Sequence, residues 1–193
     1  MKSLLVTLVV LVMVLGVSSA DAQSKMSLSV GADVLLPMGT FGDAVSTGFG
    51  GSVRGQYDLS PMAAVGLTVG YYTWSGKDVN GFTMPNFKGI PIRVFGKYYF
   101  MPAGATRVYG IAELGLFFSS VDVPSQTING VTFGGGSASS SDFNYAPGIG
   151  VEIPIGSGNT MFDGSVRYDG VATSGSSSGS LGVRVGVNFG LGN

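Results

Sequence analysis

The stretch GSLGVRVGVNFGL, residues 179–191, decides the fold because its apolar residues fall at every second position. The apolar set is Leu181, Val183, Val185, Val187, Phe189 and Leu191, and the intervening set is Gly182, Arg184, Gly186, Asn188 and Gly190. Strict alternation predicts a β-strand with one apolar face and one polar or small face. The same pattern recurs along the chain with no helix to cover it, so we expect lipid to cover the apolar faces.

The composition limits the class of protein. The chain has 193 residues with 33 Gly, only 11% charged residues, and neither Cys nor His. This length fits one domain, and the charge content is well below that of soluble proteins. The net charge of −1 creates no field that would attract nucleic acid. Without Cys there are no disulfides or thiolate metal sites, and without His the commonest general base and metal ligand is missing.

The N-terminus has the features of a secretory signal peptide. Lys2 precedes an apolar run over residues 4–17, and Ala20-Asp21-Ala22 is a cleavage site of the A-x-A type. We therefore expect a cleaved signal over residues 1–22 and one barrel domain over residues 23–193. An uncleaved anchor is the alternative, but the run is shorter than the roughly 18–20 residues that span a bilayer. No later run is long enough either, so any crossing must use strands.

Eight alternating segments follow the signal, at residues 26–37, 47–59, 62–74, 88–100, 107–119, 142–156, 160–169 and 179–191. Every second connection is longer than the others, and these long connections are residues 38–46, 75–87, 120–141 and 170–178. Short turns at one end and long loops at the other are typical of outer-membrane barrels. The pattern predicts an all-β, eight-stranded, antiparallel up-and-down transmembrane β-barrel with both termini at the periplasmic end.

Three local features give further expectations. Pro147 and Pro154 each lose a ladder hydrogen bond, which predicts β-bulges. Aromatic residues near the strand ends, with Trp74 among those at the long-loop end, predict two lipid-facing belts. In the longest loop, Asn129-Gly130 is a hairpin signal, which predicts that the flanking strands continue as a protruding ribbon, with residues 134–141 as a flexible Ser/Gly loop.

Three segments carry a family resemblance: KYYF at residues 97–100, YGIAELGLFF at 109–118 and YAPGIGVEIP at 145–154. Together with the strand pattern of the whole mature chain, they resemble the small eight-stranded outer-membrane barrels of the OmpA/OmpX type. The resemblance implies a place in the outer membrane of a Gram-negative-type envelope. It also implies two partners, the outer-membrane lipid and the barrel-assembly machinery.

Charged residues on the polar faces form the candidate site, which we interpret as a network in the lumen. Its members are Asp33, Arg54, Asp58, Arg93, Lys97, Glu113, Glu152, Asp163, Arg167, Asp169 and Arg184. An eight-stranded barrel has room inside only for side chains, so these charges must pair. Glu113 falls nearly opposite Arg93 about the intervening turn. A packed network would plug the lumen; a proton or ion path, or paired carboxylates for acid–base chemistry, is the alternative.

The remaining motifs favour no enzyme. Outer-membrane proteases and lipid A-modifying barrels resemble this chain in class, but those families use His. The Ser-rich segments lack a base to activate a nucleophile, and Gly134–Gly136 lacks the Lys and helix of a phosphate loop. Asp122 and Asp142 have no calcium-loop spacing. We expect no catalytic, cofactor-binding or metal-binding residues.

These observations lead to one functional hypothesis with two alternatives. The hypothesis is a monomeric structural and surface-interaction scaffold that has a plugged polar lumen and meets partners through its four long loops. One alternative is a narrow channel or transporter of small apolar molecules, and the other is a soluble ligand-binding barrel of the lipocalin type.

Overall fold

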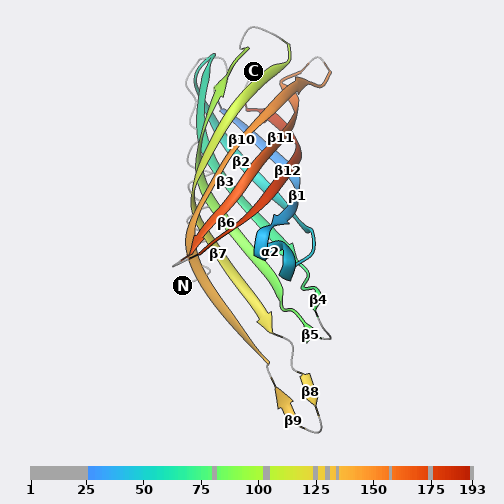
Figure 1. The fold of residues 1–193 in the computed structure, drawn as a ribbon. Helices are drawn as coiled ribbons and strands as arrows, with labels where there is room; N and C mark the ends of the chain where they lie inside the picture. The colour runs from blue at the N-terminus through green and yellow to red at the C-terminus, as the bar shows by residue number, and fades with distance from the viewer. Residues whose placement is uncertain are drawn as a thin grey trace.

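The computed structural model describes residues 26–79, 82–101, 105–123, 126–128, 131–133, 135–156, 158–173 and 176–191. Eight antiparallel strands close into one barrel in which each strand pairs with its neighbours along the chain (Figure 1). These strands are β1 (Met26–Met38), β2 (Gly48–Ser60), β3 (Ala63–Trp74), β6 (Asn86–Tyr99), β7 (Arg107–Val123), β10 (Gly136–Pro154), β11 (Thr160–Thr173) and β12 (Ser176–Gly190). The predicted fold class is confirmed. The predicted signal peptide, residues 1–22, lies outside the described residues.

Alternation along each strand places apolar side chains outside and polar ones inside. In β12, Val185 pairs with Ala32 of β1 and Gly164 of β11, and its side chain is 51% exposed. The adjacent Arg184 is fully buried in the lumen. Large hydrophobic side chains are exposed on all eight barrel strands, which fits a surface in contact with lipid rather than water.

Small elements gather at the end of the barrel where the long loops lie (Figure 1). They are the helix α2 (Gly39–Ala44), the hairpin of β4 (Asp78–Val79) with β5 (Phe82–Thr83), and the hairpin of β8 (Gln126–Ile128) with β9 (Val131–Phe133). Within the described residues no helix has the length and apolar character needed to cross a membrane. Backbone hydrogen bonds between residues 44–46 and 75–77 tie the first two long loops together.

The ribbon predicted between the fifth and sixth strands is confirmed. β7 and β10 stay paired out to Val123 and Gly136, and β8 and β9 then pair with each other out to Ile128 and Val131. The Asn129-Gly130 turn lies outside the described residues. The prediction of a flexible loop over residues 134–141 is wrong, since residues 136–141 belong to β10. Residues 136–141 are Gly, Ser and Ala, so apolar and polar side chains do not alternate there. The backbone N–H and C=O groups still pair in the ladder, because this pairing does not depend on the side chains.

Other boundaries also differ from the expectation. The predicted loop over residues 170–178 is wrong because β11 runs to Thr173 and β12 starts at Ser176. The predicted bulges at Pro147 and Pro154 are wrong, since β10 keeps one register with β7 and one with β11, although Ala146 and Pro147 have no partner in the ladder with β11. A register shift lies instead between Asp58 and Ser60 of β2, beside a short turn.

Trp74 is not part of a lipid-facing belt, as had been predicted. It is only 3% exposed and lies inside the barrel, on the same face of β3 as Tyr72. The two positions differ by two residues, so the alternation of the strand requires them to share a face. Unlike Trp74, the aromatic residues Phe49, Phe143 and Phe189 are highly exposed and point outward near the strand ends, as the belt prediction requires.

A charge placed on the outer face should destabilise the barrel according to its depth in the bilayer. We expect Val185→Arg, in the middle of β12, to lower the free energy of unfolding in lipid by about 2–4 kcal/mol. The matched control Leu59→Arg lies at the short-turn end of β2 and should cost no more than about 1 kcal/mol. Urea titrations of both variants in lipid vesicles measure the difference. Equal losses at the two sites would contradict a membrane midplane across the centre of β12.

Candidate functional site

The lumen is filled with paired charges. Of the eleven predicted residues, the structure buries ten: Asp33, Arg54, Arg93, Lys97, Glu113, Glu152, Asp163, Arg167, Asp169 and Arg184. Asp58 is only partly buried, near a short turn, where it accepts a hydrogen bond from Gln56 Nε2 at 2.7 Å. The ten buried side chains come from seven of the eight barrel strands, so the barrel brings together residues that are far apart in the sequence.

Glu113 of β7 occupies the middle of this network. Its two carboxylate oxygens lie 2.6 Å from Arg54 Nη2 and 3.0 Å from Arg93 Nε. All three side chains are essentially inaccessible to solvent. Arg93 is diagonal to Glu113, since Phe95 is the direct partner of Glu113 in the β6–β7 ladder, and residues two apart on neighbouring strands still touch through long side chains.

Arg184 of β12 links the last strand to the first two. Its Nη1 lies 2.8 Å from Asp163 Oδ2, while its Nε and Nη2 donate to Ser52 Oγ at 2.9 Å and to Ser29 Oγ at 2.8 Å. Every nitrogen of this guanidinium therefore has a partner. Asp163 also accepts a hydrogen bond from Tyr109 Oη at 2.5 Å, so the tyrosine joins the network as a neutral donor.

A second group of charges lies toward the short-turn end. Glu152 of β10 accepts from Lys97 Nζ at 2.7 Å and from Arg107 Nη2 at 2.5 Å. Arg107 stands at the start of β7 and is half-buried, and it is not among the eleven residues predicted from the sequence. With Arg107 counted, six basic side chains meet six acidic ones in the lumen and at its short-turn rim. The interior is thus balanced in charge.

A third group closes the lumen toward the long-loop end. Arg167 lies 2.7 Å from Asp33 Oδ1 and 2.8 Å from Asp169 Oδ2, and Arg93 pairs with the other oxygen of Asp169. The hydroxyl of Tyr72 accepts from Arg93 Nη2 at 3.0 Å and from Arg167 Nη2 at 2.8 Å. Every carboxylate of this group has a basic partner, so none is left as a free acid or base.

Above this group the interior changes from charged to aromatic. The buried cluster consists of Leu35, Val45, Tyr72, Trp74 and Phe117, and Phe41 of α2 and Phe87 of β6 pack against it. Phe41 meets Trp74 and Phe87 edge-on, with ring centroids 5.8 and 5.5 Å apart. The helix α2 therefore places its phenyl ring in the mouth of the barrel. Gly89 makes room for this packing, because a Cβ there would lie 1.9 Å from the Phe117 ring.

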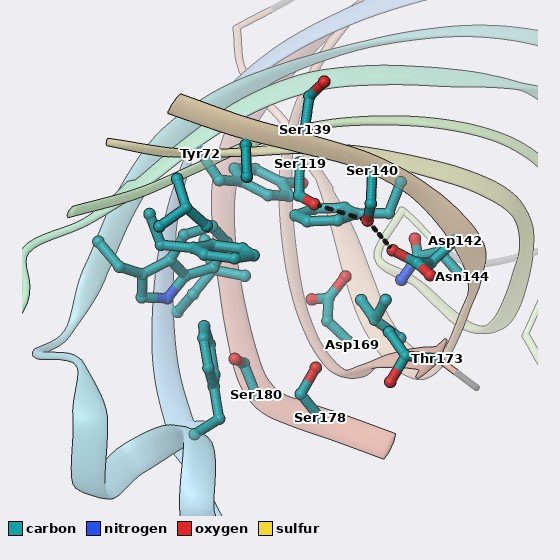
Figure 2. A pocket seen from close by; sticks show the side chains of 18 residues that line it. Tyr72, Ser119, Ser139, Ser140, Asp142, Asn144, Asp169, Thr173, Ser178 and Ser180 are labelled. Carbon is teal, nitrogen blue, oxygen red and sulfur yellow. Dashed lines mark hydrogen bonds between the residues drawn. The ribbon is translucent and has the colours of Figure 1, made fainter. Parts of the chain in front are cut away.

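The aromatic cluster forms one wall of a pocket of about 300 Å³ that opens at the long-loop end (Figure 2). The opposite wall is polar and comes from the ends of β7, β10, β11 and β12, with Ser119, Ser139, Ser140, Asp142, Thr173, Ser178 and Ser180. Asn144 and Asp169 also line it. The dashed lines in Figure 2 follow a chain of hydrogen bonds from Ser119 through Ser140 to Asp142. The ion pairs of Asp169 lie at its inner end.

This pocket is not among the sites predicted from the sequence. Apolar residues face inward at both ends of the barrel, and Phe95, Tyr99, Tyr109 and Ile111 form the buried cluster toward the short turns. At the long-loop end the inward apolar residues are Leu35, Tyr72, Trp74 and Phe117, and these four were the available signal of an apolar mouth.

The chemistry available to these sites is limited. Among the described residues, no group of three or more His, Cys, Asp or Glu side chains could hold a metal ion. The buried carboxylates face arginine and lysine, an arrangement that stabilises charge rather than transfers protons. The arrangement can therefore close the lumen and bind a small molecule at the mouth.

Comparison with solved structures shows the same small-barrel fold in several outer-membrane proteins. Neisserial surface protein A superimposes with a TM-score of 0.65 and 18% identity, over 89% of this chain and 100% of that one. A major outer membrane protein from Thermus thermophilus gives 0.58 and 17%, over 85% and 98%. Ail, the attachment invasion locus protein of Yersinia pestis, gives 0.51 and 16%, over 87% and 100%. No curated protein sequence matches significantly.

The family follows from the sequence itself. Residues 7–189 match the model of the outer membrane protein beta-barrel domain, so the chain belongs to that family. The predicted resemblance to small eight-stranded outer-membrane barrels and the predicted location in the Gram-negative outer membrane are both confirmed. The exposed apolar belt is therefore the surface that meets lipid.

Removing the central carboxylate should show how strongly the lumen network stabilises the barrel. We expect Glu113→Gln to lower the free energy of unfolding by about 3–5 kcal/mol, because it leaves Arg54 and Arg93 buried without their shared counter-charge. Asp122→Asn breaks an exposed ion pair with Lys88 and should leave stability unchanged. Urea unfolding in lipid vesicles measures both variants. A loss for Asp122→Asn as large as that for Glu113→Gln would count against the network.

Proposed function

We propose that the protein is a non-enzymatic scaffold of the outer membrane that binds partners at the cell surface and conducts no solutes. One observation carries the proposal: the lumen is closed by buried ion pairs, whereas two strands extend past the others at the long-loop end. β7 has 17 residues and β10 has 19, against the roughly 9–11 that a tilted strand needs to cross. The added length serves contact outside the membrane.

The ion pairs argue against the alternative of a channel or transporter. An ion or small solute that entered from the mouth would have to displace Arg93 and Arg167 from Asp169 and Asp33. Breaking buried pairs of this kind costs several kcal/mol for each pair. Side-chain fluctuations therefore leave the lumen closed for nearly all of the time.

The extended part of β10 supplies a surface suited to an extended polypeptide. Residues 136–142 pair with β7 on one side, and no described strand pairs with them on the other, where β11 begins its pairing at Phe143. Such an edge presents free backbone donors and acceptors to an incoming strand. The Ser side chains there keep it soluble and leave it accessible. We infer that the partner adds a strand to β10.

Charge at the long-loop end argues against a polyanionic partner. Ail has been solved with the heparin analogue sucrose octasulfate, so a polysulfate is one partner to consider. In this chain the described loop-end charges are Lys77 and Lys88 against Asp43, Asp78, Asp122 and Asp142. Acidic groups outnumber basic ones, so electrostatics would repel a polysulfate. We expect no retention on a heparin column at low salt.

A closed lumen predicts that the protein has no ion conductance in electrical recordings. Planar bilayers containing the purified barrel should show no steady conductance, because the buried pairs leave no continuous water path. The variant Glu113→Gln should show brief openings more often than the native chain. A stable and reproducible pore in the native protein would contradict the scaffold and support the channel.

Proline substitutions on β10 test strand addition with an internal control. Successive N–H groups of a strand point to opposite sides, so Ser139→Pro and Ser140→Pro remove donors from opposite edges. One variant should lower stability by breaking the β7–β10 ladder. The other should leave stability nearly unchanged and abolish attachment of cells that display the protein to a layer of extracellular-matrix protein. Attachment that survives both substitutions, or that the native chain does not confer, would contradict the proposal.

A further inference from the structure

We propose that the pocket in the barrel mouth binds a small aromatic or aliphatic molecule with a cationic ammonium head. The side chains of Ser139, Ser140 and Asp142 line this pocket, whereas strand addition would use the backbone edge of the same segment, so the inference does not depend on the proposed function. Its volume of about 300 Å³ is at the lower end of the range for small-molecule sites, which is about 300–1,000 Å³. The volume suits a single ring with a short side chain.

The apolar wall selects the body of the ligand. Phe41, Phe87 and Trp74 pack edge-on against one another, so each ring is held in place by the other two. Phe117 stacks nearly parallel to Phe87, with the two ring planes 9° apart. A preformed aromatic wall costs little ordering on binding. Rings also attract cations to their faces, which favours a ligand with a positive head.

The polar wall selects the head. Asp142 and Asp169 are the charged side chains among the described residues that line the pocket, and no Lys or Arg is among those residues. Asp169 is neutralised by Arg93 and Arg167. Asp142 accepts a hydrogen bond from Ser140, and within the described part of the chain no cation pairs with it. One uncompensated carboxylate therefore faces the pocket.

A second acceptor in the same wall is also unused. Asn144 is 1% exposed, and its Nδ2 donates to the carbonyl of Gly170 at 2.8 Å. Its Oδ1 is buried and has no hydrogen-bond partner among the described residues. Buried acceptors without a partner are costly, and a donor supplied by a ligand would remove that cost. The wall thus offers acceptors to the ligand, which favours ammonium over carboxylate.

The inner side of the pocket is closed off from the lumen. Tyr72 and Asp169 line its inner side, and both are bonded to Arg93 and Arg167 of the lumen network. A ligand that enters from the cell exterior therefore leaves the same way. The site binds reversibly and does not pass the molecule on, which distinguishes it from a transport route.

The test uses Trp74, the one tryptophan in the chain, as a built-in reporter in the pocket wall. The barrel in lipid nanodiscs is titrated with three probes of matched size: 2-phenylethylamine, 2-phenylethanol and phenylacetate. We expect saturable changes in Trp74 fluorescence, with the amine binding most tightly and the anion most weakly. Equal affinities for the three probes, or tightest binding of phenylacetate, would overturn the proposal even if no variant folds.

Two variants assign the preference to one carboxylate. Asp142→Asn should weaken binding of the amine roughly fivefold, as expected for a half-exposed ion pair, and leave the alcohol unchanged. The matched control Asp122→Asn removes a carboxylate that pairs with Lys88 and does not line the pocket, so all three affinities should stay the same. An unchanged preference in Asp142→Asn, or an equal loss in Asp122→Asn, would refute the assignment. Heat-modifiable migration on gels verifies that both variants are folded.

Discussion

Pairing of arginine with carboxylate inside a narrow barrel is the interaction on which the rest of this structure depends. Eight strands leave an interior that side chains fill, so a charge placed there can be stabilised only by another side chain. Glu113 pairs with Arg54 and Arg93, and Asp169 pairs with Arg93 and Arg167, so Arg93 links the two carboxylates. Because these side chains fill the interior, the pocket and the free edge of β10 both lie at the long-loop end.

The two ends of the barrel differ in what their inward-facing residues do. Toward the short turns, Lys97 and Arg107 surround Glu152, and aromatic rings lie beneath the cations, with Lys97 Nζ 4.2 Å from the centre of the Tyr109 ring. Toward the long loops the same inward register carries Trp74 and Phe117, and the carboxylates of Asp142 and Asp169 face them across the pocket. The short-turn end is filled by its ion pairs and by the buried cluster around Tyr109, whereas the long-loop end leaves an open recess.

The sequence predicted what depends on alternation and failed where alternation is absent. Val185 outside and Arg184 inside follow from a period of two, and so does the burial of the network residues. Residues 136–141 are Ser, Ala and Gly, so side chains gave no sign that β10 continues there, although the backbone ladder does. Trp74 was misassigned because its residue type, rather than its position in the register, was used. Leu35, Tyr72, Trp74 and Phe117 could have indicated an apolar mouth, but the shape of the pocket also depends on Phe41 of α2, whose place in the mouth no strand pattern predicts.

The contacts of Arg184 also bear on how the barrel forms. This residue belongs to the last strand, yet it bonds to Ser29 on β1 and Ser52 on β2, the former 155 positions away along the chain. Arg167 on β11 reaches Asp33 on β1 in the same way. None of these bonds can exist in an open sheet, because β1 and β12 meet only at the seam that closes the cylinder. The two guanidinium groups therefore lose their water and gain these partners only when β1 pairs with β12 and closes the cylinder. Opening the seam again would strip both groups of their partners at once, so the closed cylinder should persist kinetically once it has formed.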